Sequence, residues 1–136
     1  MMRSGIYKEV QFDASHRLLH YQGKCANLHG HRWKVEVWIE GTANPDTQIL
    51  LDYNTIKEVV YRYDHQVILN EDDPMVEYLS KFQKVVTTPG DPTSELLAVL
   101  IRDALNEQCK KEGVPASVRR IRVWESIGCY AEIRND

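Results

Sequence analysis

Three histidines and a cysteine near the start of the chain have the types and spacing that metal or proton-transfer chemistry needs. His29 and His31 open a segment in which apolar and polar residues alternate, and Cys25 precedes His29 by four residues. In a β-strand, residues i and i+2 project to the same side of the sheet, with Cα atoms roughly 7 Å apart. If this segment is a strand, the two imidazoles can therefore converge on one ion.

A third imidazole extends this pair to a candidate catalytic metal site. His16 is in phase with an earlier alternating segment, whereas His20 competes with it if a turn at Leu18 and Leu19 directs that ring inward. We favour His16 because of its strand phase. Catalytic zinc typically has three protein ligands and keeps a fourth position for water or substrate, whereas structural zinc has four protein ligands. The three histidines therefore predict a zinc site. The role of Cys25 decides whether that site is catalytic or structural.

Cys25 has two candidate roles. As a fourth zinc ligand, it would close the site and make it structural. As a base or nucleophile, it needs a partner that favours the thiolate, because the thiolate is the reactive form. Asp64 and His65 are candidates for that partner, since a histidine that is oriented by an aspartate can exchange a proton with a thiol. The same two residues are also compatible with an ordinary solvated helix end.

Two glutamates are candidate substrate-binding residues. Glu125 follows Trp124 at the end of an apolar strand, where an inward-facing carboxylate needs a partner. It could bind both N–H groups of a guanidine-like edge, as in a pterin or guanine, or it could pair with Arg120 or Arg122. Glu95 could take part in a site, or it could only favour the N-terminus of the helix that it begins.

Length and composition indicate one domain over residues 1–136 and exclude several classes of partner. The 17 basic and 20 acidic residues give a net charge of -3, which argues against general binding to nucleic acid or to a membrane surface. No apolar run approaches a membrane span, and we find no signal-peptide pattern, so we expect a cytoplasmic protein. The three cysteines are an odd number, which favours free thiols over a disulfide framework.

Alternation of apolar and polar residues predicts the strands that must position the site. The first two strands hold the histidines, and a loop over residues 17–30 carries Cys25. Trp38 interrupts the polar face of the second strand, which indicates that a helix or another subunit covers that face, and we favour a subunit. The expected strands are residues 5–14, 31–40, 84–88 and a C-terminal hairpin over 118–133.

Two main helices are expected between these strands. Asp52 is the expected N-cap of a short helix that ends directly before the Asp64–His65 pair. A longer amphipathic helix is expected to begin with Asp91 as the capping side chain and Pro92 as the first residue, and to end before Gly113. These elements predict an α+β fold with an antiparallel four-stranded sheet and the two helices on one face.

Six segments, taken together, resemble the 6-pyruvoyl-tetrahydropterin synthase and 6-carboxytetrahydropterin synthase family over about residues 6–133. No single segment is decisive, but their order and spacing are specific. The resemblance implies the tunnelling fold, in which the sheets of several subunits join into a barrel, typically a homohexamer of two trimers with active sites between subunits. The segments are Phe12-x-Ala14-Ser15-His16-Arg17-Leu18, Cys25-x-x-x-His29-Gly30-His31, Asp52-Tyr53, Asp64-His65, Pro92-Thr93-Ser94-Glu95 and Trp124-Glu125-Ser126.

The resemblance also implies a role for each candidate residue. The zinc ligands would be His16, His29 and His31. The catalytic thiol and its proton-relay partners would be Cys25, Asp64 and His65. The pterin pocket would contain Glu125 as the anchor, together with Glu95 and Thr93. The chain departs from the family pattern at Asp91, where asparagine is frequent, and at Trp33, where smaller or polar residues are common.

The implied substrate is 7,8-dihydroneopterin triphosphate, and the implied cofactor is Zn2+ alone. The short chain and the Cys-x-x-x-His-Gly-His segment favour the carboxy-forming branch of queuosine biosynthesis, which yields 6-carboxy-5,6,7,8-tetrahydropterin, acetaldehyde and triphosphate. The alternative product is 6-pyruvoyl-tetrahydropterin, which would be made with the same residues. From a different class, a non-catalytic zinc-stabilised assembly module or a pterin-binding protein would bind without turnover.

Overall fold

Two long strands form the centre of the sheet and extend beyond their predicted ranges. In the computed structural model, which describes residues 2–135, β1 (Arg3–His16) pairs antiparallel with β2 (His29–Thr42) along its whole length. Alternate residues such as Phe12 and Trp33 are buried on one face, because successive side chains of a strand point to opposite sides. Both strands therefore carry an apolar stripe that ends at the histidines.

The sheet has six strands rather than the expected four, and it is mixed rather than antiparallel. The segment expected at residues 84–88 joins the sheet as β4 (Val85–Thr88), and the strand that no pattern indicated is β3 (Gln66–Asn70), which pairs parallel with both β1 and β4. Its sequence has no alternation to reveal it, because Ile68, Leu69 and Asn70 are all buried. The C-terminal hairpin is confirmed. The sheet order is β4 (Val85–Thr88), β3 (Gln66–Asn70), β1, β2, β5 (Ala116–Ser126), β6 (Cys129–Arg134).

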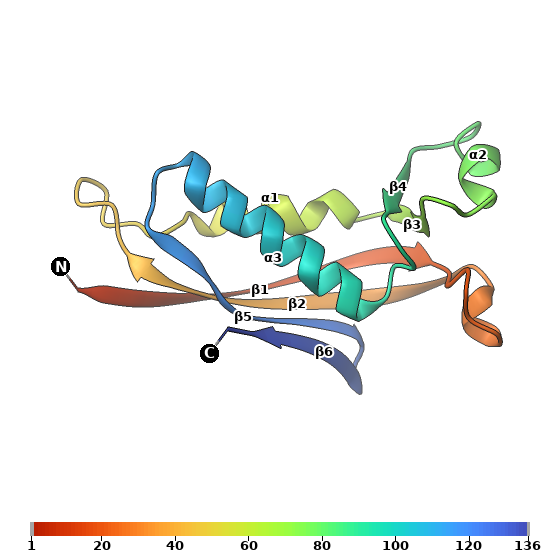
Figure 1. Cartoon of the computed structure of the whole chain (residues 1–136), viewed down its shortest axis with the longest axis horizontal. Helices are drawn as coiled ribbons and strands as arrows, with labels where there is room; N and C mark the ends of the chain where they lie inside the picture. The colour runs from red at the N-terminus through yellow and green to blue at the C-terminus, as the bar shows by residue number, and fades with distance from the viewer. Residues whose placement is uncertain (1, 136) are drawn as a thin grey trace.

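Two main helices cover one face of the sheet, as expected (Figure 1). Ile56 of the first helix and Leu97 and Ile101 of the second are buried in the core that they form with the sheet. Among residues 2–135, no helix is long and apolar enough to cross a membrane. The helical segments are η1 (Lys24–Ala26), α1 (Tyr53–Val60), η2 (Tyr61–Tyr63), α2 (Met75–Leu79) and α3 (Ser94–Lys111).

The predicted cap is confirmed for α1 and wrong for α3. Oδ1 of Asp52 accepts a hydrogen bond from the backbone N–H of Asn54 (2.8 Å). At α3, the capping side chain is Thr93, whose Oγ1 accepts from the backbone N–H of Leu96 (3.1 Å). The helix therefore begins two residues later than expected, because the carboxylate of Asp91 binds other backbone groups described below.

The helix-free face of the sheet carries Trp38. The guanidinium groups of Arg120 and Arg122 lie over its ring, 4.9 Å and 5.4 Å from the centroid. Such cation–π contacts stabilise an aromatic ring on a surface that also faces water. No helix of the described chain covers this face (Figure 1), so a covering subunit stays a prediction.

Gly41 is needed where β2 passes the segment that leads into β5. A Cβ at this position would lie 2.6 Å from the Cβ of Ala116 and would also clash with the backbone of Pro115. We therefore expect Gly41→Ala to reduce the free energy of unfolding by about 1–3 kcal/mol, as overpacking does. Urea denaturation measures this change. Gly128→Ala is the matched control, because no atom lies within 4 Å of its added Cβ; equal losses in both variants would contradict the steric argument.

Candidate metal centre and active site

The three predicted zinc ligands meet at one end of the central strand pair. His16, the last residue of β1, pairs with His29, the first residue of β2, and His31 follows two residues later on the same face. The ring centroids lie 4.7 Å apart for His16 and His29, 4.8 Å for His29 and His31, and 5.4 Å for His16 and His31. His20 is not part of this group. Strand phase therefore placed His16, rather than His20, beside the other two histidines.

Glu125 of β5 is the fourth member of this group. One ligand atom from each of the four residues lies within 4.8 Å of the others. Oε1 of Glu125 is 2.9 Å from Nε2 of His31 and 3.7 Å from Nε2 of His16. Tetrahedral zinc ligands lie about 3.4 Å apart, so small side-chain movements would suit an ion. The sequence indicated that Glu125 faces inward, in phase with the buried Val123, but it did not place the carboxylate beside the histidines.

Backbone carbonyls orient two of the rings. Nδ1 of His16 donates to the carbonyl of Pro92 (2.7 Å), and Nδ1 of His29 donates to the carbonyl of Asn27 (2.6 Å). Because a carbonyl only accepts, each Nδ1 carries the hydrogen and each Nε2 has a free lone pair.

This arrangement fits a metal ion. The Nε2 atoms of His16 and His31 are buried and make no well-aligned hydrogen bond, although Oε1 of Glu125 lies 2.9 Å from Nε2 of His31. A buried polar atom in this state is costly unless something else satisfies it. Burial lowers the pKa of His16, and this effect outweighs the opposing effects of the Pro92 carbonyl and Glu125. The ring is therefore held in the neutral form that binds metal.

Asp64 and His65 lie against β1 and contact each other. Oδ1 of Asp64 accepts from the backbone N–H of Asp13 (3.1 Å), and Oδ2 lies 3.0 Å from Nδ1 of His65. Burial by itself would raise the pKa of Asp64, but the hydrogen bonds from Asp13 and His65 outweigh it and lower the pKa below its usual value. The carboxylate is therefore ionised and can orient the imidazole.

His65 faces open space next to the metal group. Its backbone is left-handed (φ 58°), an unfavourable conformation for a residue with a Cβ, and its N–H donates to the carbonyl of Asp13 (2.6 Å). Its side chain is 77% exposed and lines an open pocket of about 550 Å³ that His31 also lines. Within residues 2–135, no hydrogen bond joins His65 to Cys25, so their relay stays a prediction.

Cys25 lies in η1, inside the loop that connects His16 to His29. The backbone N–H of Leu18 donates to the carbonyl of Cys25 (2.8 Å) and closes the base of the loop. The thiol is half-buried and free, and it is not a member of the four-residue metal group. The geometry therefore does not support a structural zinc site closed by Cys25.

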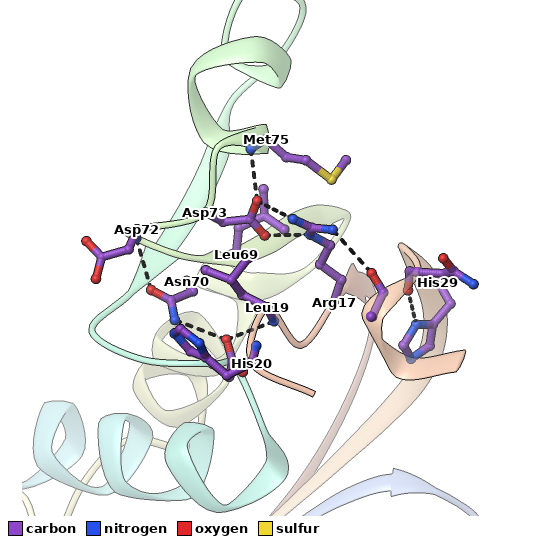
Figure 2. A network of polar contacts seen from close by, with 12 residues as sticks. Arg17, Leu19, His20, His29, Leu69, Asn70, Asp72, Asp73 and Met75 are labelled. Carbon is purple, nitrogen blue, oxygen red and sulfur yellow. Dashed lines mark hydrogen bonds and ion pairs between the residues drawn. The ribbon is translucent and has the colours of Figure 1, made fainter. Parts of the chain in front are cut away.

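An ion pair between Arg17 and Asp73 holds this loop (Figure 2). The carboxylate of Asp73 is fully buried and accepts from Nε (2.6 Å) and Nη2 (2.8 Å) of Arg17. The third donor of the guanidinium, Nη1, reaches the carbonyl of Ala26 (3.3 Å), next to Cys25. Asp73 also accepts from the backbone N–H of Met75 (2.9 Å), so its oxygens are well satisfied.

Asp91 holds the start of the same loop. Its Oδ1 accepts from the backbone N–H of Leu19 and from Nδ2 of Asn70 (both 3.0 Å), and its Oδ2 accepts from the backbone N–H of His20 (2.8 Å). This role explains why Asp91 does not cap α3. It also uses both carboxylate oxygens, which an asparagine at this position could not supply.

Thr93 and Glu95 lie at the N-terminus of α3. Thr93 caps the helix, and Glu95 accepts from the hydroxyl of Ser94 (2.9 Å). Neither belongs to the metal group. This helix end is nevertheless close to it, because the Pro92 carbonyl binds His16. A role for Thr93 and Glu95 in a pterin pocket stays a prediction.

The Arg17–Asp73 pair makes stability depend on pH. Hydrogen bonds from Arg17 lower the pKa of Asp73 below its usual value. A carboxyl group whose pKa is lower in the folded state stabilises the fold above about pH 4 and loses this contribution as the pH falls through the folded pKa. We therefore expect the free energy of unfolding to fall more steeply below about pH 4 in the wild type than in Asp73→Asn. Urea unfolding at several pH values measures this, and equal slopes would contradict it.

The model of the 6-pyruvoyl tetrahydropterin synthase family matches residues 5–136 of this chain. The chain belongs to this family. Relatives carry the name of the carboxy-forming enzyme: 6-carboxy-5,6,7,8-tetrahydropterin synthase from Rickettsia felis is 29% identical over 93% of this chain and 96% of its own. A Pyrococcus abyssi relative, named provisionally for the same enzyme, is 34% identical over 94% of this chain and 88% of its own. The resemblance in the sequence is confirmed.

Solved structures share the fold of this family member. A crystal structure of an uncharacterized protein from Wolinella succinogenes has a TM-score of 0.77 at 21% identity, covering 100% of both chains. 6-pyruvoyl tetrahydropterin synthase from Caenorhabditis elegans has a TM-score of 0.65 at 22% identity, covering 100% of this chain and 98% of its own. At these identities the likeness shows the fold alone, which is the tunnelling fold of a single chain.

Proposed function

We propose that this protein converts 7,8-dihydroneopterin triphosphate and one water to 6-carboxy-5,6,7,8-tetrahydropterin, acetaldehyde and triphosphate, as a zinc-dependent lyase of queuosine biosynthesis. The observation that carries the proposal is the meeting of His16, His29 and His31 beside Glu125, with buried Nε2 atoms on His16 and His31 that make no well-aligned hydrogen bond. The names of the relatives favour the carboxy product. The members of the family act on a pterin, so the substrate is a small molecule.

In this proposal, some residues of the chain would bind the metal and others would transfer protons. His16, His29 and His31 would hold zinc, and zinc bound there would make the hydroxyl groups of the substrate side chain more acidic. The Cys25 thiolate would take a proton from that side chain. His65, oriented by the ionised Asp64, would donate a proton back to the pterin.

Glu125 would bind the pterin ring, and Thr93 and Glu95 would line its pocket. The carboxylate of Glu125 is 30% exposed at the metal group, so it can reach a ligand as well as the histidines. An anchor of this kind would accept two hydrogen bonds from the N–C–N edge of the ring.

The variant Glu125→Gln distinguishes between two roles of Glu125, a pterin anchor and a metal ligand. We expect the zinc content to stay at the wild-type level and kcat/KM to fall roughly 10- to 150-fold, because a hydrogen bond to a charged group contributes about 1.5–3 kcal/mol. Metal analysis and steady-state kinetics measure the two quantities. Loss of zinc with an unchanged KM in the loaded variant would instead identify Glu125 as a ligand.

The reaction itself is tested with the zinc-loaded protein and 7,8-dihydroneopterin triphosphate. Products are identified by mass spectrometry, with acetaldehyde trapped in the same reaction. Carboxy-tetrahydropterin with acetaldehyde supports the proposal. A pyruvoyl product, for which the structural neighbours named 6-pyruvoyl tetrahydropterin synthase are the precedent, would move the protein to the other branch. Unchanged substrate would favour a zinc or pterin-binding module without turnover.

We also propose that residues 1–136 form one domain of a cytoplasmic homohexamer made of two trimers, without nucleic-acid or membrane partners. Support comes from the sheet, whose outer strands β4 and β6 each have one unpaired edge among the described residues. Free strand edges are ready to pair with another chain. Light scattering coupled to gel filtration tests the assembly, and a monomer at micromolar concentration would contradict it.

A further inference from the structure

We propose that Arg17 and Asp73 are positioning residues, which hold the Cys25 loop and the His29 ring in register with the metal group. The inference concerns residues outside the catalytic set and rests on the proposed function for the role of Cys25. Figure 2 shows the network: Asp73, from the connection between β3 and α2, holds Arg17 at the end of β1. The two residues are 56 positions apart, so only the tertiary fold brings them together.

The contacts run without a gap from Asp73 to a metal-ligand candidate. Asp73 fixes the guanidinium of Arg17, and Arg17 binds the carbonyl of Ala26. The next carbonyl along the chain, that of Asn27, accepts from Nδ1 of His29. The peptide between Ala26 and Asn27 is therefore held by Arg17, and the carbonyl of the next peptide orients the imidazole of His29. A shift of this peptide would move the thiol and the ring together.

The chemistry of the pair suits positioning. A guanidinium that binds a carboxylate through two parallel bonds is fixed in direction as well as in place, so its remaining nitrogen, Nη1, points in one direction. The side chain of Arg17 is only 20% exposed and each of its three nitrogens donates to Asp73 or Ala26, which leaves it badly placed to bind a triphosphate. A lysine would keep the charge but would lose the fork.

Asp91 supports the same arrangement at the other end of the loop. It holds the backbone of Leu19 and His20, while the carbonyl of the next residue, Pro92, orients His16. Two carboxylates from distant segments therefore brace the loop on both sides of Cys25. This repetition argues that the loop conformation serves the site, because each brace leads to a carbonyl that sets a histidine ring.

The test measures the Cys25 thiol and the metal directly, beside turnover. All proteins carry Cys129→Ser, because Cys129 is exposed, whereas Cys109 is buried. The variants are Asp73→Asn and Arg17→Lys, and the control is Asp103→Asn, which breaks an exposed pair with Arg102 (3.1 Å) on α3. We measure the alkylation rate of Cys25 by iodoacetamide, the rate of zinc loss to a chelator, and kcat and KM.

We expect Asp73→Asn to lose zinc roughly 10-fold faster, the lower end of the effect of removing an outer partner of a ligand, because Asp73 reaches His29 only through Arg17 and the loop. We expect its kcat to fall roughly 100-fold with a smaller change in KM, since a misplacement of about 1 Å costs that much. The alkylation rate should change several-fold, and Asp103→Asn should behave like the wild type. If Asp73→Asn does not fold, Arg17→Lys gives the same test with the carboxylate intact.

The inference would be overturned if a folded Asp73→Asn or Arg17→Lys protein had the alkylation, zinc-loss and turnover rates of the wild type. A lower Tm in such a variant would not change this conclusion. The experiment distinguishes failure of the positioning role from failure of the proposed reaction. If the wild type makes no carboxy-tetrahydropterin but the variants still change the thiol and zinc rates, the positioning holds and the proposed reaction fails. If the wild type makes product and the variants match it in all rates, the reaction holds and the positioning fails.

Discussion

Cys25→Ala is expected to lose turnover and to keep its zinc. The thiol is not part of the four-residue group that could hold the ion, so its removal leaves His16, His29 and His31 in place. The reaction would lose the group that takes a proton from the substrate, and a positioned acid or base contributes roughly 10²- to 10⁴-fold to a rate. Steady-state product formation and metal analysis of the purified variant measure both effects.

The control for this variant is Cys129→Ala, which removes an exposed thiol in β6 and should keep wild-type turnover. Cys25→Ser is a useful companion, because a hydroxyl keeps the size of the side chain but is a much weaker acid than a thiol. It should also be inactive. A Cys25→Ala protein that loses zinc would instead revive the structural zinc site, and one that retains full turnover would exclude the thiol from the chemistry.

His16→Ala is expected to weaken zinc binding by more than about 100-fold. Loss of an outer partner alone costs roughly 10- to 100-fold, and His16 is a predicted ligand with a buried, unpartnered Nε2. Zinc bound there would also stabilise the folded wild type, by about 2.7 kcal/mol at a free concentration of 100 times Kd. Added zinc should therefore raise the Tm of the wild type and leave the Tm of His16→Ala nearly unchanged.

His20→Ala is the matched control, because it removes the competing histidine four residues later, which lies outside the metal group. Its zinc affinity and its Tm increase with zinc should equal those of the wild type. Competition with a fluorescent chelator and thermal unfolding with and without zinc measure the two quantities. Equal affinities in both variants would mean that His16 is not a ligand, and a loss in His20→Ala alone would reverse the assignment.

The histidine group was predictable because strand geometry is local. A period of two residues places His29 and His31 on one face with Trp33, and the same alternation places His16 with Phe12. The pairing of β1 with β2 then brings the ends together. The Asp52 cap and the C-terminal hairpin were predictable for the same reason, since each depends on residues close together in the chain.

The missed features depend on residues far apart in the sequence. β3 has no alternation because both of its sides are covered, and burial on both sides is decided by its neighbours. Asp91 matched a helix cap by local pattern, yet its carboxylate binds the backbone of Leu19 and His20, more than 70 positions away. Where a long-range donor competes with a local one, sequence spacing cannot show which of them the carboxylate binds.

The sequence by itself determined the ligand types, their common face and the family, because these follow from residue identity and short-range periodicity. Only the tertiary structure decided that Glu125 joins the histidines and that Asp73 reaches the Cys25 loop through Arg17. Both depend on where strands and connections from different parts of the chain meet in space. The physical reason is that hydrogen bonds and metal coordination act over about 3 Å, at sites that chain folding alone brings together.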